Sequence, residues 1–312
     1  MLDLVFCGTP AFAVPTLEKL VAAGFRVKLV VTQPDRPSGR GMELAASPVK
    51  RSALALDLPI TQPDKIKNNE EFREQLRAIA PQTIIVVGYG RIIPQWMIDL
   101  PPLGNLNLHA SLLPKYRGAA PIQWAIAMGE TVTGVTTMRI DAGLDTGDIL
   151  LQSEERIRPE DTAVTLAPRL AQTGAELMIA TLAGLQSETI TPTAQDNTKA
   201  TLAPILKRED GLIDFSRTAT DAWNRLRGFQ PWPGAFTTFR DKMLHIHAAV
   251  PSEEPSAVAA AHFAAKKDRL LLGFAHDTAL EVQELQVEGK KRMSAQDFIN
   301  GYRPRSEETL GG

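Results

Sequence analysis

The first half of the chain alternates short apolar runs with longer segments in which apolar residues recur every three or four positions. The runs are rich in β-branched residues and poor in charge, which is typical of strands buried on both faces. The expected strands are residues 2–7, 26–32, 83–87, 105–109 and 135–140; the expected helices are residues 15–23, a helix that starts at Ser47-Pro48, and residues 70–79. This alternation predicts an α/β fold with a Rossmann-like, mostly parallel sheet.

The pattern changes after residue 140. We expect a strand at 148–157 to form a hairpin with the strand before it, and a long amphipathic helix at 162–185. Shorter strands follow at residues 235–240, 243–250, 269–274 and 280–287, with helices near 218–228 and 294–300. The polar, proline-containing stretch between these two parts is typical of a linker. We therefore predict a first domain at residues 1–188, a linker at 189–205 and a C-terminal OB-like β-barrel domain at 206–312.

Composition narrows the class of protein. The chain has 312 residues, of which 44% are hydrophobic, and Cys7 is its single cysteine. One cysteine excludes an intrachain disulfide and a multi-cysteine metal site, and it favours a reducing compartment. We find no signal peptide pattern and no run of membrane-spanning length, so we expect a cytoplasmic protein. The net charge of −2 argues against a broadly basic nucleic-acid binder, and any phosphate-binding site must be local.

Two polar residues interrupt the apolar strand at 105–109. Asn107 and His109 are two positions apart, so they share one face at the end of the strand, where ligands of open α/β sheets bind. A buried histidine satisfied by a neighbouring amide explains the pair about equally well. The segment 141–148 holds three acids after the next strand and offers Asp145 as a partner for His109. A turn with solvated acids or a calcium loop is the alternative, although the acids lack EF-hand spacing.

Other catalytic and binding motifs fail on spacing. Gly88 and Gly90 are not followed by the third glycine of a dinucleotide-binding fingerprint. The chain has no phosphate-binding Walker loop, no Gly-x-Ser-x-Gly elbow and no His-Glu-x-x-His zinc helix. Ser111 lies near His109, but a serine at the start of a proline-containing loop is more often a turn residue than a nucleophile.

Longer motifs resemble one known family. Asn107-Leu-His109, Ser111-Leu-Leu-Pro114, Arg117-Gly118 and the DAGLDTGD segment at 141–148 closely resemble the formyltetrahydrofolate-dependent formyltransferases. The TQPDRPSGRG segment at 32–41 and Ser47-Pro-Val-Lys50 resemble the members of that family that act on aminoacyl-tRNA. The similarity runs from about residue 6 to about residue 297, which is nearly the whole chain.

The resemblance implies a function and a set of site residues. The expected reaction transfers the formyl group of 10-formyltetrahydrofolate, a co-substrate, to the α-amine of methionine on initiator tRNA, without a metal. The family's catalytic triad corresponds to Asn107, His109 and Asp145. Its folate-binding residues correspond to Ser111, Leu112, Leu113 and Pro114, together with Gly88, Tyr89 and Gly90. The expected tRNA contacts are Arg36, Arg40, Lys50 and Lys207, and the protein is expected to be a monomer.

One departure and two rivals remain. Family members often carry lysines after Gly-Arg-Gly, whereas Met42-Glu43 follow here, so Arg40 becomes the main expected contact of a surface loop that orders on binding. A related formyltransferase that acts on an amino-sugar nucleotide is the nearer rival. A non-catalytic RNA-binding protein is the more remote one, because the net charge is close to neutral and the triad is intact.

Overall fold

The computed structural model describes residues 2–38, 43–253, 257–266 and 268–311. The chain forms two compact units, and each draws on more than one stretch of sequence. The first unit consists of Met1–Pro121, Val132–Arg156 and Ala167–Ala203, and the second of Ile122–Thr131, Ile157–Leu166 and Pro204–Gly312. Within the described ranges, no helix is both long and apolar enough to cross a membrane.

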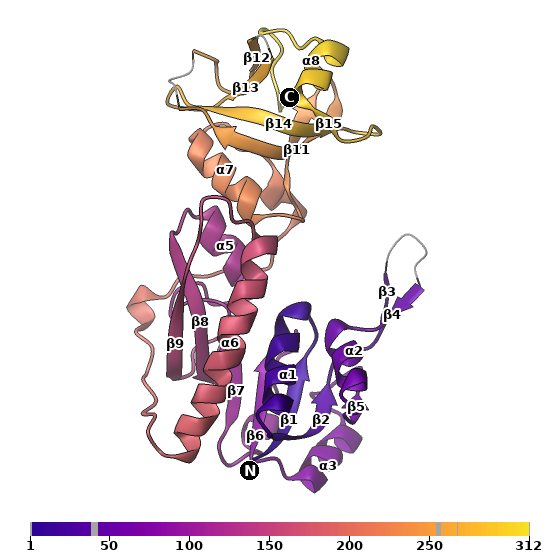
Figure 1. The fold of residues 1–312 in the computed structure, drawn as a ribbon, viewed down its shortest axis with the longest axis vertical. Coiled ribbons are helices and arrows are strands. Elements are labelled where there is room, and N and C mark those ends of the chain that lie inside the picture. The colour runs from indigo at the N-terminus through magenta and orange to yellow at the C-terminus, as the bar shows by residue number, and fades with distance from the viewer. Residues whose placement is uncertain (1, 39–42, 254–256, 267, 312) are drawn as a thin grey trace. The chain divides into compact units, whose positions relative to one another are not determined.

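A seven-stranded sheet forms the centre of the first unit (Figure 1). In spatial order its strands are β5 (Ile60–Thr61), β2 (Arg26–Val31), β1 (Asp3–Gly8), β6 (Thr83–Val87), β7 (Asn105–His109), β8 (Val132–Arg139) and β9 (Ile149–Arg156). The strands from β5 to β7 are parallel, and β8 and β9 are antiparallel to their neighbours. The mostly parallel, Rossmann-like sheet predicted from the sequence is confirmed.

Helices cover both faces of this sheet. They are η1 (Ala11–Ala13), α1 (Val14–Ala22), α2 (Pro48–Ala55), α3 (Glu70–Ile79), α4 (Gln95–Ile98) and most of α6 (Ala163–Gln186), whereas α5 (Pro121–Ala127) belongs almost entirely to the second unit. Side-chain caps fix two of their starts: Ser47 accepts a hydrogen bond from the backbone N–H of Lys50, and Asn69 accepts one from that of Phe72. Such caps satisfy N–H groups that have no partner within the helix. The predicted starts of α2 and α3 are therefore confirmed.

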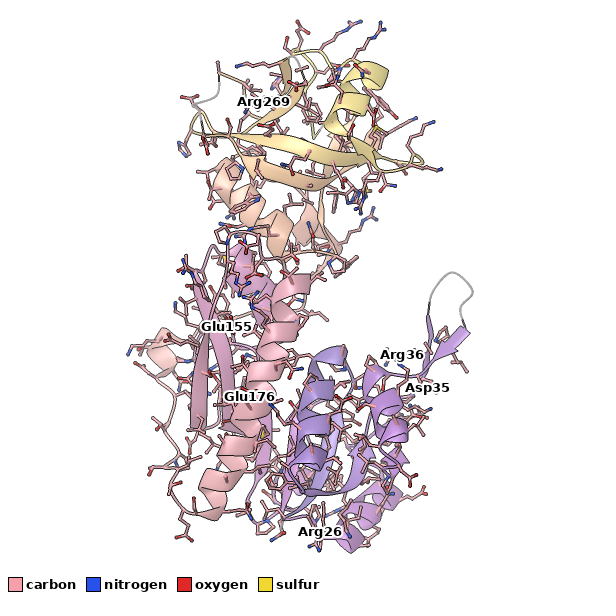
Figure 2. The ribbon with its side chains drawn as sticks, in the orientation of Figure 1. Arg26, Asp35, Arg36, Glu155, Glu176 and Arg269 are labelled. Atoms are coloured by element: carbon pink, nitrogen blue, oxygen red, sulfur yellow. The ribbon has the colours of Figure 1, made fainter. Side chains whose placement is uncertain are left out.

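The two faces of β7 meet different helices. Leu108 packs against Gly174 of α6, where an added Cβ would lie 2.6 Å from Cδ2 of Leu108. Helix α1 shares that face, because Lys19 forms an ion pair with Glu176 of α6 at 2.7 Å (Figure 2 labels Glu176). On the opposite face, Asn105 donates hydrogen bonds to the carbonyls of Met97 and Ile98 in α4. Because side chains alternate along a strand, Asn107 and His109 face away from α6.

The segment between β2 and α2, expected to be a surface loop, contains a short hairpin. Strand β3 (Arg36–Ser38) pairs antiparallel with β4 (Glu43–Ala45). Asp35 and Arg36 lie at its base (Figure 2). Ladder hydrogen bonds between β3 and β4 therefore hold the ends of this segment together.

The second unit contains an antiparallel sheet. Its strands follow the order β10 (Ala235–Phe239), β11 (Lys242–Pro251), β14 (Ala279–Val287), β13 (Arg269–Gly273) and β12 (Phe263–Lys266), and β15 (Met293–Ser294) pairs with β14. Helices η3 (Arg208–Gly211), α7 (Ala219–Gly228) and α8 (Ala295–Tyr302) accompany it. Phe239, Phe263 and Phe298 meet in its core. The predicted C-terminal domain of short strands is confirmed as an antiparallel sheet.

The stretch predicted as a linker makes regular contacts with the first unit. Thr193 exchanges backbone hydrogen bonds with Ile149, at 2.8 and 2.9 Å, and Ala203 exchanges them with Arg117 and Ala120. A single 3-10 turn, η2 (Asn197–Lys199), lies between these two attachments. Residues 193–203 thus form a strap along the first unit, and we use that name for them below.

Candidate active site

Asn107 and His109 stand at the carboxyl end of β7, in the region where parallel sheets bind their ligands. Asn107 pairs with Val86 of β6 and with Met138 of β8. Its side chain is half-buried and forms no hydrogen bond with any described residue. An amide with free donors at this edge of the sheet can donate to a ligand. The predicted sharing of one strand face by the two residues is confirmed.

His109 is buried, and both of its ring nitrogens face oxygen atoms. Nε2 lies 2.9 Å from the carbonyl oxygen of Tyr116. Because a carbonyl only accepts hydrogen bonds, Nε2 carries the proton. Nδ1 lies 3.7 Å from Oδ2 of Asp145, just outside hydrogen-bond distance. The geometry leaves Nδ1 as a base with a carboxylate beside it.

Asp145 occupies a strained position that its surroundings maintain. Its φ of 52° lies in the left-handed region, which is unfavourable for a residue with a Cβ. The backbone N–H of Gly118 donates to Oδ2 of Asp145 at 2.8 Å. On the far side, an added Cβ at Gly147 would lie 1.9 Å from the carbonyl oxygen of Arg139, so only glycine fits there. These contacts fix the carboxylate next to His109.

A glutamine from the strap also holds this loop. Nε2 of Gln195 donates to the backbone carbonyls of Asp145 and Gly147, at 2.9 and 2.7 Å. Oε1 of Gln195 accepts from Nε and Nη2 of Arg117, at 3.0 and 2.7 Å. Nη2 of the same arginine reaches Asn197 of the strap at 2.8 Å. The strap, the arginine and the acidic loop therefore form one hydrogen-bonded unit.

The predicted folate-binding segment follows β7 directly. Ser111 donates its hydroxyl to the carbonyl of Lys115 at 2.6 Å, and its own carbonyl accepts from Thr136. Gln152 donates to the carbonyl of Leu113 at 2.9 Å. Ser111 and Leu113 are buried, whereas Leu112 and Pro114 remain partly exposed. Most polar groups of this segment are thus hydrogen-bonded within the protein, which holds the segment in one conformation.

The second predicted folate-binding segment follows β6, next to β1, where the strand order of the sheet reverses. Gly88 and Gly90 both have positive φ, at 56° and 78°, which glycine adopts without strain. The carbonyl of Tyr89 accepts hydrogen bonds from Thr9 and Gln33, at 3.3 and 3.0 Å. Burial raises the pKa of the Tyr89 hydroxyl, which keeps it neutral.

Three buried polar atoms near this loop have no hydrogen-bond partner in the described part of the chain. They are the hydroxyl of Tyr89, Oε1 of Gln33 and Nε of Arg91. Buried polar groups are nearly always paired, so unpaired ones suit a site that receives a polar ligand. Tyr89 packs in the apolar core, so it is Oε1 of Gln33 and Nε of Arg91 that could meet a donor and an acceptor, respectively, of a heterocycle.

Some of the predicted tRNA contacts are exposed, whereas another is already paired with a carboxylate. Arg36 is exposed on β3, and Lys207 is exposed in the second unit. Lys50 instead forms an ion pair with Asp35 at 2.6 Å, and its hydrogen bond is the main cause of the lowered pKa of that carboxyl. Gln62 donates to the other oxygen of Asp35. Arg40 lies outside the described residues.

The acidic loop has no metal site among the residues that the structure describes: no group of three or more His, Cys, Asp or Glu side chains could hold an ion. The carboxylate of Asp141 accepts from the backbone of Gly143 and from the hydroxyl of Thr146. Its oxygens thus stabilise the turn that leads to Asp145.

Comparison with known proteins decides the family. The family model described as formyl transferase matches residues 3–182, and the model described as formyl transferase, C-terminal domain, matches residues 205–303. The chain belongs to the formyl transferase family. The methionyl-tRNA formyltransferase of Koribacter versatilis is 68% identical over 99% of this chain and 98% of its own length. That of Acidobacterium capsulatum is 62% identical over 99% of this chain and 100% of its own length.

Solved structures agree with the fold of this formyl transferase. An N-formyltransferase from Helicobacter canadensis, solved with folinic acid and dTDP-3-aminofucose, has a TM-score of 0.68 at 20% identity and covers 91% of this chain and 99% of its own. The phosphoribosylglycinamide formyltransferase of Bacillus halodurans has a TM-score of 0.51 at 25% identity, over 60% of this chain and 96% of its own. The second comparison spans much less of this chain than the first.

No local sequence pattern indicated the residues that support the predicted triad. Arg117 and Gly118 appeared only as part of a motif, and no pattern pointed to Tyr116 as the partner of His109. Gln195 lies in a stretch whose polarity predicted a linker. Its contact with Asp145 spans 50 residues of sequence, so no local pattern could show it.

Proposed function

We propose that this chain transfers the formyl group of 10-formyltetrahydrofolate to the α-amine of methionine esterified to initiator tRNA. The main support for this reaction is the arrangement of three side chains. The free amide of Asn107 and the base His109 lie on one strand face, and the carboxylate of Asp145 lies beside the base. The acceptor follows from the full-length relatives, which are methionyl-tRNA formyltransferases.

Asn107 stabilises charge that develops on the formyl oxygen. When the amine attacks the formyl carbon, the oxygen becomes negative, and the side-chain amide of Asn107 donates to it. The amide has no partner among the described residues, so it does not need to break a hydrogen bond first. A preorganised donor of this kind is typically worth about 3 to 4 kcal/mol of the barrier.

His109 moves the proton. A C–N bond forms between the methionine amine and the formyl carbon, the bond between that carbon and N10 of the folate breaks, and one proton passes from the amine to N10. Nδ1 of His109 accepts that proton, because Nε2 is already protonated and donates to Tyr116. Asp145 stabilises the resulting imidazolium. General acid–base catalysis of this kind contributes about 10² to 10⁴ in rate.

10-Formyltetrahydrofolate supplies an activated formyl group, and two segments are proposed to hold it. Leu112 and Pro114 offer apolar surface beside the catalytic residues, while Ser111 and Leu113 keep that surface rigid. Gly88, Tyr89 and Gly90, with the unpaired groups of Gln33 and Arg91, offer polar contacts to a heterocycle. These are the groups that we propose orient the formyl donor.

For tRNA we propose the contacts Arg36, Arg40, Lys50 and Lys207. Guanidinium groups bind phosphate in a bidentate manner, so Arg36 and Arg40 are expected to contribute most. Lys50 reaches a phosphate with its charge already balanced by Asp35 and is expected to contribute less. We further propose that the protein acts as a monomer in the cytoplasm, where charged tRNA is made.

The test is a direct assay with two acceptors. Purified protein is incubated with 10-formyltetrahydrofolate and methionyl-tRNA, or with an amino-sugar nucleotide of the kind bound by the Helicobacter canadensis enzyme, and both products are analysed by mass spectrometry. A mass gain of one formyl group on the methionine is expected. Transfer only to the sugar amine would favour the nearer rival, and no transfer to either would favour a binding protein.

A further inference from the structure

The acidic loop depends on one side chain from the strap. Asp145 has a left-handed φ, which aspartate adopts more readily than most residues with a Cβ but which is still less favourable than ordinary backbone conformations. Two backbone carbonyls of this loop, of Asp145 and of Gly147, converge on a single amide nitrogen, Nε2 of Gln195. The loop is therefore attached to the strap at the position of the catalytic carboxylate.

The orientation of that amide is fixed by Arg117. A guanidinium only donates hydrogen bonds, so the atom of Gln195 that meets Nε and Nη2 of Arg117 must be the oxygen. The nitrogen of the amide must then point to the two carbonyls. Because Arg117 is buried at 7% exposure, it cannot easily swing away and let the amide turn over.

The same short segment contacts both members of the catalytic pair. The carbonyl of Tyr116 accepts from His109, and the N–H of Gly118 donates to Asp145. Arg117 lies between them in sequence and carries the link to Gln195. A change in that link therefore acts on the distance between His109 and Asp145.

We propose that Gln195, oriented by Arg117, is a positioning residue that sets the placement of the Asp145 carboxylate against His109. This rests on the proposed function, since it assumes that Asp145 acts in formyl transfer. Gln195 touches no reacting atom in this scheme; it acts through the loop. Removing its two donated hydrogen bonds lowers kcat and leaves the KM values for both substrates nearly unchanged.

The decisive variant is Gln195→Glu. A glutamate still accepts from Arg117, so the buried arginine stays paired and the fold is preserved, but a carboxylate cannot donate to the two carbonyls. We expect kcat to fall by about 10- to 100-fold, since misplacing a catalytic group by 1 Å costs on the order of 10²-fold. Arg117→Lys, which keeps the charge but loses the two-pronged contact, should give a smaller fall. Gln172→Glu, at an exposed position on α6, is the matched control and should keep wild-type kcat.

A double-mutant cycle separates positioning from general damage. If Gln195 acts through Asp145, Gln195→Glu should have little further effect on kcat in an Asp145→Asn background, because residues that act as a unit are not additive. If Gln195→Glu lowered kcat by the same factor in the wild-type and the Asp145→Asn backgrounds, the proposal would be overturned. So would a Gln195→Glu enzyme with wild-type kcat. Changed ring ¹⁵N shifts of His109 in folded Gln195→Glu protein would support it, and unchanged shifts would count against it. If the wild-type enzyme itself formylates nothing, the proposed function fails instead.

Discussion

Oδ2 of Asp145 accepts a hydrogen bond from the backbone of Gly118 at 2.8 Å while lying 3.7 Å from Nδ1 of His109. The carboxylate is thus held by the backbone and faces the base without being bonded to it. An imidazolium at His109 would find a negative charge already in place. This arrangement needs the charge of Asp145 as well as its shape.

Asp145→Asn separates charge from shape. The amide oxygen still accepts from Gly118, so the loop should keep its conformation, but the stabilising charge is lost. We expect kcat to fall by up to about 10⁴-fold, which is the upper range for general acid–base catalysis, with little change in the free energy of unfolding. Steady-state kinetics and urea unfolding check both. A variant with near wild-type kcat would remove Asp145 from the triad.

Gly118→Ala should weaken both the fold and the activity. Gly118 has a φ of 121°, and an added Cβ would lie 2.7 Å from the carbonyl oxygen of Ala203 in the strap. We expect a loss of about 1 to 3 kcal/mol in the free energy of unfolding, together with lower kcat as the N–H that holds Asp145 shifts. Gly104→Ala is the control, because it has a φ of 79° but no atom within 4 Å of the new Cβ. It should cost less stability and leave kcat unchanged.

The local sequence pattern was sufficient to predict several strands and helices of the first unit. The predicted strands at 83–87 and 105–109 and the helix at 70–79 match β6, β7 and α3 residue for residue. The hydrophobic pattern within a buried strand or an amphipathic helix indicates that element, so a short stretch of sequence is enough to predict it. The sequence did not indicate the hairpin of β3 and β4, because residues 34–41 hold two prolines and two glycines, a composition typical of loops.

Contacts between segments distant in sequence could not be predicted from the local sequence pattern. The strap was predicted as a linker because it is as polar as an exposed spacer. One of its polar side chains, Gln195, instead donates a hydrogen bond to the backbone of Asp145. Residues 122–131 and 157–166 belong to the second compact unit, although they lie within the predicted first domain in sequence. Lys50, one of the expected tRNA contacts, is paired with Asp35. Each case depends on chain topology, which composition and periodicity do not encode.

The second unit offers a pH test. Hydrogen bonds from Arg240, and then from the backbone of Arg305, lower the pKa of Glu308 to about 2. Because the folded pKa lies below the ordinary value of 4.5, the pair stabilises the fold above that value, and the contribution is lost as pH falls from about 4.5 to 2. NMR titration of Arg240→Met should show the pKa of Glu308 rising toward 4.5. The loss of stability at pH 7 should stay below about 1 kcal/mol, because the pair is partly exposed. An unchanged titration would show that Arg240 is not the cause.

Salt dependence should separate Arg36 from Lys50. If Arg36 contacts a phosphate, Arg36→Ala should lower kcat/KM for methionyl-tRNA and reduce the slope of log(kcat/KM) against log[salt] by roughly 0.7 to 0.9, the value of one phosphate contact. Lys50→Ala should change the slope less, because Asp35 already balances its charge. Equal slopes for wild type and Arg36→Ala would exclude that contact. Kinetics with a small free amine as acceptor provide the control, since neither variant should affect it.

Two asparagines on the same face of β7 should show opposite behaviour. Asn105 is buried and donates to the carbonyls of Met97 and Ile98, at 2.8 and 2.9 Å, whereas the amide of Asn107 bonds to no described residue. Asn107→Leu should therefore keep or raise the free energy of unfolding and lower kcat by about 10² to 10³, because only the donor to the formyl oxygen is lost. Asn105→Leu should instead cost about 1 to 3 kcal/mol, since it leaves two buried carbonyls without these donors, and should keep kcat in the folded fraction. Denaturant unfolding and single-turnover kinetics measure both quantities. Should Asn107→Leu unfold more easily than Asn105→Leu while retaining turnover, Asn107 would be a structural residue and the donor to the formyl oxygen would have to lie elsewhere.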